Sequence, residues 1–315
     1  MRDSFGRTID YLRLSVTERC DLRCRYCMEE GGVPKRSHEE MLRIEELAEI
    51  SEAAVSLGVR KIRLTGGEPL VRRGLLTLCQ RLSVLPGLEE LCLTTNGSRL
   101  RDFAAPLRAA GVSRLNISLD TLQEEKFAFL TRRGRLADTL AGIAAAEEAG
   151  FDRLKINCVL LGGINDDEIG DFLRLTYDHP WEVRFIELMP MGPCAHWGKE
   201  RFLPVRTVLE RFPDLQPLPE DEGVARRHQL PGAVGSIGLI SPMSCDFCPR
   251  CRRLRVTADG HLLPCLHAKT ERNLRGLHGE ELRAALLAGA MAKPLGHHLC
   301  DGGSETMRDM NEIGG

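Results

Sequence analysis

The sequence predicts an α/β protein in which helices cover a parallel sheet of six strands. Short apolar runs rich in Val, Ile and Leu alternate with longer helical stretches over the first two thirds of the chain, and Gly58, Gly111 and Gly150 each follow a helical stretch. This alternation is typical of parallel sheets, and a glycine after a helix is a common C-cap. Six strands are fewer than the eight of a full barrel, so a partial barrel and a doubly wound sheet both stay open.

The predicted elements follow one another in a regular order. Strands are expected near 11–17, 61–66, 90–95, 114–119, 153–160 and 182–188. Helices are expected near 39–57, 72–84, 100–110, 136–149, 167–177 and, much later, 279–290. After about residue 192 the rhythm breaks, and Pro204, Pro213, Pro217 and Pro219 indicate a connecting region.

Composition excludes several classes of partner. The chain has 315 residues, 43% of them hydrophobic and 28% charged, which is ordinary for a globular protein. A net charge of −2 gives no global attraction for polyanions, and 5% aromatic residues offer no stacking platform for nucleic acid. No apolar run approaches the about 18 residues of a membrane helix, and no signal-type segment opens the chain. We therefore expect a cytoplasmic protein, where the 12 cysteines serve metal binding, catalysis or packing rather than disulfides.

Polar and glycine residues gather where the predicted strands end. They are Thr17, 65–68, 94–97, Ser118, Asp120, Asn157 and 187–189. Because parallel strands end at one edge of the sheet, and that edge carries the active site in α/β folds, these residues predict a single site.

The first cysteine cluster follows the first predicted strand. Cys20, Cys24 and Cys27 are spaced C-x3-C-x2-C. Three thiolates on a short loop can bind three irons of a [4Fe–4S] cluster and leave the fourth iron open to a ligand. Structural zinc usually needs four ligands, and the nearest histidine is His38. Buried core cysteines would not need this spacing.

A second cysteine cluster lies in the last quarter of the chain. Cys248, Cys251 and Cys265 are spaced C-x2-C-x13-C. A zinc site stays open here, because Cys245 and His267 could complete four ligands.

The first cluster resembles the signature of the radical S-adenosylmethionine (SAM) superfamily, with Tyr26 at the aromatic position before the third cysteine and a GGEP element at 66–69. The resemblance implies that SAM chelates the open iron and that the reduced cluster cleaves it to methionine and a 5′-deoxyadenosyl radical. It also implies that the backbone of Gly67 contacts the SAM amino group and that Tyr26, Ser118 and Met189 line the SAM pocket.

Further segments resemble one family within that superfamily, the GTP 3′,8-cyclases of molybdenum cofactor biosynthesis. They are CPRCRRLRVTADGHLLPCL at 248–266, FGRTIDYLRLSVTERC at 5–20, LTTNG at 93–97, RLNISLD at 114–120, GIND at 163–166, RFIE at 184–187 and MNEIGG at 310–315. The resemblance implies a partial (β/α)6 barrel over 1–225 and a C-terminal cluster domain over 226–315. It implies a second [4Fe–4S] cluster on Cys248, Cys251 and Cys265, whose open iron binds guanine. Cys245 departs from the family pattern and could exchange with Cys248.

Basic residues on predicted strands are candidates for phosphate binding. Strand alternation puts Arg13, Lys61, Arg63, Lys155 and Arg184 on the face opposite the apolar residues, where unpaired charge is costly unless a ligand neutralises it. Strand lysines are otherwise solvated or ion-paired. Four charge-assisted hydrogen bonds contribute on the order of 6–12 kcal/mol gross, against about 8 kcal/mol net for micromolar affinity. No Walker loop is present.

The resemblance assigns these residues to the substrate. It implies that Arg13, Arg63, Thr94, Lys155, Arg253, Leu254 and Arg255 contact GTP. Arg13, Arg253 and Arg255 are the candidate catalytic residues, because they orient the triphosphate or place charge during reduction. A terminal Gly-Gly is usually frayed, but the resemblance implies that the tail enters the site.

The expected reaction removes hydrogen from C3′ of GTP, joins C3′ to C8 of guanine and yields 3′,8-cyclo-7,8-dihydro-GTP. The resemblance further implies a homodimer, a low-potential electron donor and delivery of the product to cyclic pyranopterin monophosphate synthase. The alternatives are a peptide-modifying radical SAM enzyme and a non-enzymatic zinc module. No role beyond packing is assigned to Cys79, Cys92, Cys158, Cys194 or Cys300.

Overall fold

The computed structural model describes residues 1–33, 40–220, 223–244, 247–297, 299 and 304–314. Four residues named in the sequence analysis, His38, Cys245, Cys300 and Gly315, lie outside these ranges.

The six predicted strands form one parallel sheet, in chain order. They are β1 (Tyr11–Ser15), β2 (Lys61–Thr65), β3 (Glu90–Thr95), β4 (Arg114–Ser118), β5 (Lys155–Leu160) and β6 (Glu182–Glu187). The predicted bounds differ from these by at most two residues. The α/β fold with a parallel sheet is thereby confirmed.

Two strands from the last third of the chain extend this parallel sheet. β9 (Ser236–Ile240) pairs with β6 and β10 (Arg253–Val256) pairs with β1, both in parallel. The outer strands are antiparallel: β7 (Gln216–Pro217), β8 (Arg226–Gln229), β11 (His261–Leu263) and β12 (Arg272–Asn273). Within the described ranges no strand pairing joins β7 to β12, so hydrogen bonds do not close the sheet.

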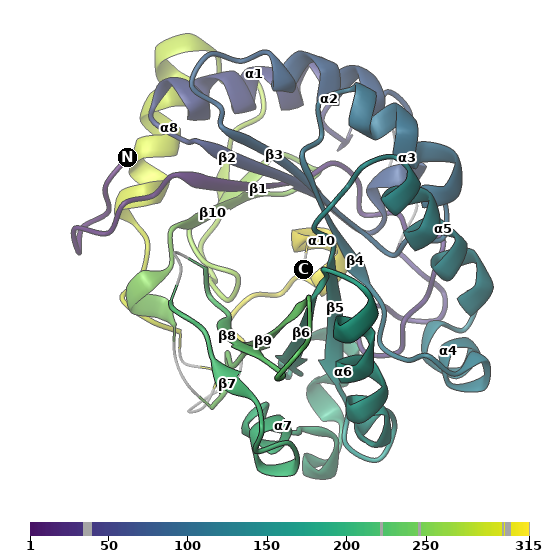
Figure 1. Ribbon diagram of the computed structural model, residues 1–315. Coiled ribbons are helices and arrows are strands. Elements are labelled where there is room, and N and C mark those ends of the chain that lie inside the picture. Colours follow the sequence, from purple (N-terminus) through teal and green to yellow (C-terminus); the bar gives the residue numbers. More distant parts are fainter. Residues whose placement is uncertain (34–39, 221–222, 245–246, 298, 300–303, 315) are drawn as a thin grey trace.

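Helices cover the outer face of the sheet (Figure 1). They are α1 (Ile44–Ser56), α2 (Leu75–Ser83), α3 (Leu100–Ala109), α4 (Glu124–Thr131), α5 (Leu136–Glu148), α6 (Ile169–Asp178), α7 (Arg206–Arg211) and α8 (Gly279–Met291). The last helix, α10 (Met310–Ile313), lies with the C-terminus inside the curve of the strands (Figure 1). The sequence did not predict α4 or α7, and the expected connecting region contains α7 and β7.

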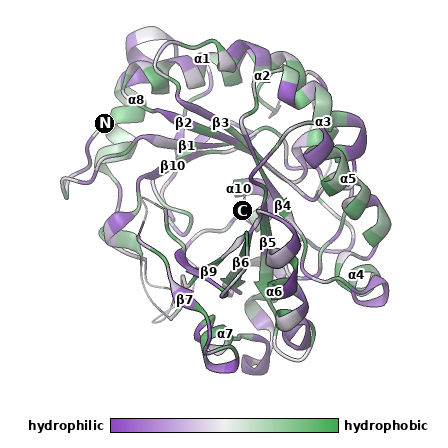
Figure 2. Cartoon of the chain, in the orientation of Figure 1, coloured by the Kyte–Doolittle hydropathy of each residue, from purple (hydrophilic) through white to green (hydrophobic). Residues whose placement is uncertain are grey.

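Strand alternation divides apolar from polar side chains. Leu12, Leu14, Ile62 and Leu64 are buried and pack in the main hydrophobic core. The helices turn their apolar sides toward the sheet and their polar sides outward (Figure 2). The side chains between them, including Arg13 and Arg63, point to the inner side. No helix in the described residues is long and apolar enough to cross a membrane.

Candidate active site

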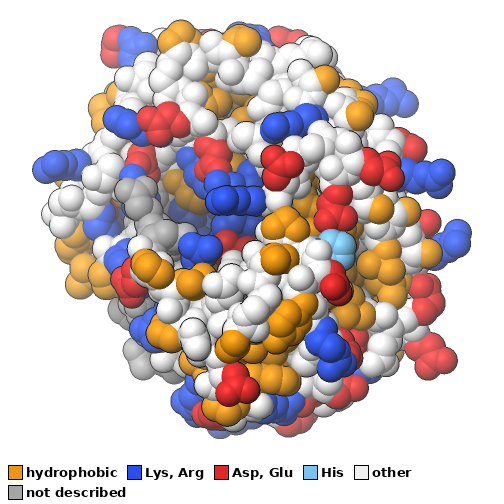
Figure 3. Space-filling view, viewed as in Figure 1, with side chains coloured by type: hydrophobic (Ala, Val, Ile, Leu, Met, Phe, Trp, Pro, Cys, Tyr) orange, Lys and Arg blue, Asp and Glu red, His pale blue; other side chains and the backbone are white. Residues whose placement is uncertain are grey.

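The curved sheet encloses one large cavity. Its volume is about 1020 Å³, and side chains from all eight parallel strands line it. Figure 3 shows basic side chains with a few acidic ones gathered inside the hollow. The six cysteines of the two predicted clusters all line this cavity. The sequence prediction of a single site is therefore supported by the geometry.

The topology separates the two cysteine triads. Cys20, Cys24 and Cys27 follow the carboxyl end of β1. Cys248 and Cys251 precede the amino end of β10, and Cys265 follows β11, which runs antiparallel to β10. Because β1 and β10 are parallel neighbours, the first triad lies at the carboxyl edge of the sheet and the second at the amino edge. The two triads thus flank the cavity from opposite ends.

The first triad suits an iron–sulfur cluster. The backbone N–H groups of Cys27 and Met28 both donate to the carbonyl of Cys24, which winds the loop tightly. Leu22 N–H lies 3.4 Å from the Cys20 Sγ and donates to it. Burial raises the pKa of all three thiols, that of Cys27 to about 12. Only a bound cation would favour the thiolates there, which fits cluster iron.

A glycine-rich turn supports this triad. A Cβ on Gly66, whose φ is +145°, would lie 2.2 Å from the carbonyl oxygen of Thr17, and one on Gly67 would lie 2.4 Å from that of Arg19. Only glycine lets these segments pass so closely. The buried Glu68 carboxylate accepts hydrogen bonds from Leu70 N, Thr95 Oγ1 and Asn96 N and so joins the turn to β3.

The predicted SAM residues lie together beside this turn. Tyr26, Gly67, Ser118 and Met189 all line the cavity. The Tyr26 hydroxyl donates to Asp120 Oδ2 at 2.7 Å, which orients the ring. The four residues come from separate segments, and their gathering supports the predicted SAM pocket without testing it.

The second triad lies in a more basic environment. Burial raises the pKa of Cys251, but the charges of Arg253 and Lys293, together with hydrogen bonds from Arg253, outweigh burial and bring that pKa to about 6. A thiolate is the form that binds iron. His267, a possible fourth ligand in the zinc interpretation, bonds through Nδ1 with Ser304 Oγ at 3.0 Å. Within the described residues no three His, Cys, Asp or Glu side chains are placed to hold a single metal ion.

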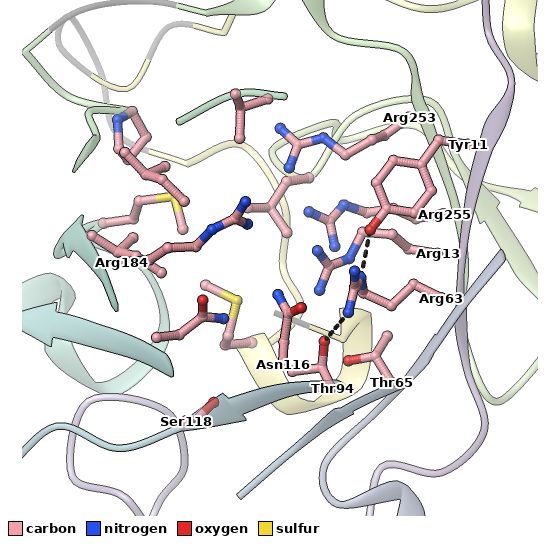
Figure 4. Close-up of a pocket in the computed structure, with 18 of the residues that line it drawn as sticks. Tyr11, Arg13, Arg63, Thr65, Thr94, Asn116, Ser118, Arg184, Arg253 and Arg255 are labelled. Atoms are coloured by element: carbon pink, nitrogen blue, oxygen red, sulfur yellow. Dashed lines mark hydrogen bonds between the residues drawn. The ribbon is translucent and has the colours of Figure 1, made fainter. Parts of the chain in front are cut away.

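Four arginines gather on one wall of the cavity (Figure 4). The register aligns Arg13 with Arg63 on β2 and with Arg255 on β10, and Arg253, two residues before Arg255, lies on the same face. Burial and neighbouring cations lower the pKa of Arg255, and burial together with Arg63 and Arg253 lowers that of Arg13 to about 10. This crowding of like charge favours an anionic ligand.

Tyr11 and Thr94 hold Arg63 in this wall. Its Nε donates to the Tyr11 hydroxyl at 2.6 Å, and its Nη1 donates to Leu93 O and Thr94 Oγ1 (Figure 4). Burial raises the pKa of Tyr11, but Arg63 and Arg13 outweigh burial and bring it to about 8. The predicted pair of Arg63 and Thr94 is thus brought together in the cavity.

The two strand lysines have acidic partners that the sequence analysis missed. Lys61 pairs with Glu90, and Lys155 Nζ lies 2.8 Å from Glu182 Oε2. Glu182 also pairs with Arg184. Glu90 and Glu182 each begin a predicted strand, a signal that could have placed them on the inner face. Of the alternatives left open for strand lysines, the structure shows ion pairing, because carboxylates on adjacent strands pair with both.

The side chain of Leu254 points away from the cavity. Its side chain is 1% exposed and packs in the main hydrophobic core, whereas Arg253 and Arg255 line the cavity. Alternation along β10 turns it to the opposite face. The Leu254 side chain therefore does not face the cavity, and the predicted contact of the 253–255 stretch with GTP stays a prediction.

Two further polar residues face the cavity. The buried oxygens Asn116 Oδ1 and Asn157 Oδ1 have no hydrogen-bond partner in the described structure. Both side chains line the cavity, on β4 and β5. A buried carbonyl oxygen without a donor is costly, so these amides are suited to a ligand with hydroxyl or N–H groups. The sequence marked Asn157 only as a polar strand-end residue.

The C-terminal tail reaches the arginine wall. Arg255 Nη1 donates to Gly314 O at 2.7 Å. Gly314 has a φ of +76°, and a Cβ there would lie 2.3 Å from Thr65 Cγ2. The expected entry of the tail into the site is thus confirmed as far as Gly314. Of the remaining cysteines, Cys79, Cys92 and Cys158 are buried, and Cys194 lines the cavity beside the first triad.

The close approach at Gly67 leads to a prediction. Gly67→Ala should displace the loop of the first triad, because the new Cβ meets the carbonyl of Arg19. We expect iron after anaerobic reconstitution to fall from about eight to about four atoms per chain, measured with a colorimetric assay. Gly31→Ala is the control, since nothing lies within 4 Å of that Cβ. Full iron loading and unchanged SAM binding in Gly67→Ala would contradict the assignment.

Comparisons with known proteins agree with this geometry. Residues 14–176 match the radical SAM superfamily, and residues 181–299 match the family described as Molybdenum Cofactor Synthesis C. The GTP 3′,8-cyclase of Peptoclostridium acidaminophilum is 48% identical and covers 99% of this chain and 98% of its own. That of Moorella thermoacetica is 45% identical, with 100% of both chains covered.

Solved structures show the same fold at low sequence identity. Streptococcus suis SuiB bound to S-adenosylmethionine has a TM-score of 0.61 and 15% identity, covering 97% of this chain and 75% of that one. A structure of anSMEcpe with bound AdoMet has a TM-score of 0.57 and 16% identity, covering 86% and 80%. From its cysteine motifs, fold and full-length relatives, this chain belongs to the radical SAM superfamily and, within it, to the family of the GTP 3′,8-cyclases.

Proposed function

We propose that this protein is a GTP 3′,8-cyclase, a lyase that converts GTP to 3′,8-cyclo-7,8-dihydro-GTP in the first step of molybdenum cofactor biosynthesis. One observation carries the proposal: a single cavity has a cysteine triad at each end and a wall of buried and partly buried arginines between them. That arrangement offers a SAM site, a purine site and a polyphosphate site within reach of one substrate molecule.

The first triad and its turn would hold the SAM-binding [4Fe–4S] cluster. Cys20, Cys24 and Cys27 supply three thiolates, and the Gly67 backbone with Tyr26 lines the adjoining space. SAM bound at the reduced cluster supplies the oxidant that takes hydrogen from C3′ of GTP. The surrounding strands limit access of water to this space.

The second triad would hold a [4Fe–4S] cluster with one iron open to guanine. Cys248, Cys251 and Cys265 are its ligands in this proposal, and Arg253 favours the Cys251 thiolate. Because this cluster lies at the amino edge of the sheet and the first at the carboxyl edge, the nucleotide would lie between them with its base toward the amino edge. Once the 5′-deoxyadenosyl radical has taken the C3′ hydrogen, the C3′ radical would add to C8 of the same molecule. One electron from the low-potential donor and one proton would then reduce the resulting aminyl radical to the product.

The arginine wall would bind the triphosphate. Arg13, Arg63, Arg253 and Arg255 present guanidinium groups to one region of the cavity (Figure 4), and Thr94 lies beside Arg63. Arginine forks suit phosphate oxygens, and burial strengthens these contacts. Lys155 and Arg184 form a second basic group across the cavity. Both pair with Glu182, so they would bind phosphate once these ion pairs are partly broken.

Other parts of the proposal concern organisation and partners. We assign 1–225 to the radical SAM core and 226–315 to the cluster and substrate-binding part, a boundary that falls between β7 and β8. The family implies a cytoplasmic homodimer, a low-potential electron donor, and transfer of product to cyclic pyranopterin monophosphate synthase.

Anaerobic turnover tests the proposed function. Reconstituted protein with SAM, reductant and GTP should form 3′,8-cyclo-7,8-dihydro-GTP, identified by liquid chromatography and mass spectrometry. Cys24→Ala should abolish the product, because the first cluster loses a ligand. Cys79→Ala is the control, since this buried thiol packs in α2 away from the cavity. Turnover by Cys24→Ala, or zinc in place of iron in the active protein, would contradict the proposal.

GTP binding should weaken with rising pH. Burial lowers the pKa of Lys155 to about 8. The ammonium that attracts phosphate is therefore present below pH 8 in the free protein and is lost above it. We expect roughly fourfold weaker GTP binding at pH 8.5 than at pH 7, measured by isothermal titration calorimetry.

Lys155→Arg is the matched variant for this pH series. Arginine stays charged throughout the range, so the variant should bind GTP with little pH dependence. Equal pH dependence in the wild-type protein and Lys155→Arg would show that another group controls binding.

A further inference from the structure

The segment after α8 lies behind the second cysteine triad. Lys293, Pro294 and Leu295 follow the last turn of this helix. Lys293 is 3% exposed and lines the same cavity as Cys248, Cys251 and Cys265. An ammonium is rarely buried so deeply without compensating contacts, so its partners indicate its role.

Lys293 joins two of the segments that carry the cysteines. Its Nζ donates to Arg253 O and to Pro264 O, both at 2.9 Å. Arg253 lies two residues after Cys251, and Pro264 immediately precedes Cys265. One ammonium group therefore sets the spacing between the segments that carry Cys251 and Cys265.

Arg7 holds the third cysteine from the other side of the same segment. Its Nη1 donates to Cys248 O at 2.8 Å and to Leu295 O at 3.0 Å, and its Nη2 donates to Pro294 O at 2.5 Å. Asp3 accepts from Arg7 Nε and fixes the guanidinium. The Arg7 side chain is 8% exposed.

Together these contacts bind Cys248 directly and the backbone within two residues of Cys251 and Cys265. We propose that Lys293 and Arg7 form a clamp that positions Cys248, Cys251 and Cys265 for the second iron–sulfur cluster and tunes its reduction potential. The clamp is defined as the two side chains and the backbone of 293–295. It rests on the proposed function, because the cluster it serves belongs to that function.

The clamp acts through position and charge. The three carbonyls it binds lie at or within two residues of the cysteines, so losing it frees the ligand segments to move apart. A cluster held by thiolates gains negative charge on reduction, so a buried ammonium beside it stabilises the reduced state. Both residues are positioning residues, and neither needs to touch GTP.

The test compares Lys293→Met and Arg7→Lys with the wild-type protein. Lys293→Met keeps the length of the side chain and removes its charge, whereas Arg7→Lys keeps the charge and loses the fork that reaches Cys248, Pro294 and Leu295. Lys269→Met is the control, because this exposed lysine lies four residues from Cys265. Each protein is reconstituted anaerobically and examined for iron, for electron paramagnetic resonance of both reduced clusters, and for midpoint potentials.

The expected result is specific to the second cluster. Lys293→Met should retain between about four and eight irons per chain, and the second cluster that remains should have a more negative midpoint potential. Arg7→Lys should lose iron with a smaller change in potential. The first cluster should keep its SAM-dependent spectral change in every variant, which also shows that the chain is folded.

Two results separate the clamp from the function it serves. Full iron and unchanged second-cluster potentials in both variants would overturn the clamp, while leaving the cyclase proposal intact. A wild-type protein with only about four irons per chain would overturn the proposed second cluster itself. Loss of the first cluster's SAM response in Lys293→Met would also overturn the clamp, because the effect would then be general.

Discussion

The structure depends on a parallel sheet whose inner face is polar and charged. Outward residues such as Leu12 and Leu64 pack under the helices, while Arg13 and Arg63, one position away, line the cavity, with Arg63 buried and Arg13 partly buried. Buried like charges raise the free energy of the ligand-free protein unless they have partners. Tyr11, Glu90 and Glu182 supply part of this compensation. A bound polyphosphate would supply the rest, so substrate binding would further stabilise the folded protein.

The same strand order separates the two cysteine triads. The first follows a strand and the second precedes its parallel neighbour, so the two lie at opposite edges of one sheet. The distance between them is thus set by strand length, which the hydrophobic core holds rigid. The clamp also joins parts of the chain that are far apart in the sequence. Arg7 comes from the segment before β1, and Lys293 follows the end of α8. The N-terminal segment therefore stabilises a site built almost entirely by the C-terminal third.

Local sequence patterns predicted the six strands, most helices and the cysteine sites, because each of these leaves a signal within a short window. The pairs Lys61–Glu90 and Lys155–Glu182 were missed, because they depend on the register between different strands. The short strands β9 and β10 were missed because they depend on pairing with β6 and β1, which are distant in the sequence. Leu254 belongs to the same contiguous motif as Arg253 and Arg255, but alternation along β10 turns its side chain away from the cavity. Cys251 and Arg253 lie near Lys293 only in the folded chain, so the clamp has no signal in the sequence.

The central claim is that GTP lies between the two clusters with C3′ facing the first. The most direct measurement uses GTP carrying deuterium at C3′, incubated anaerobically with reconstituted protein, SAM and reductant, followed by mass spectrometry of the 5′-deoxyadenosine released. The account predicts one deuterium in 5′-deoxyadenosine and none after incubation with GTP deuterated at C2′. Unlabelled 5′-deoxyadenosine from the C3′-deuterated substrate, formed together with the cyclised product, would contradict it.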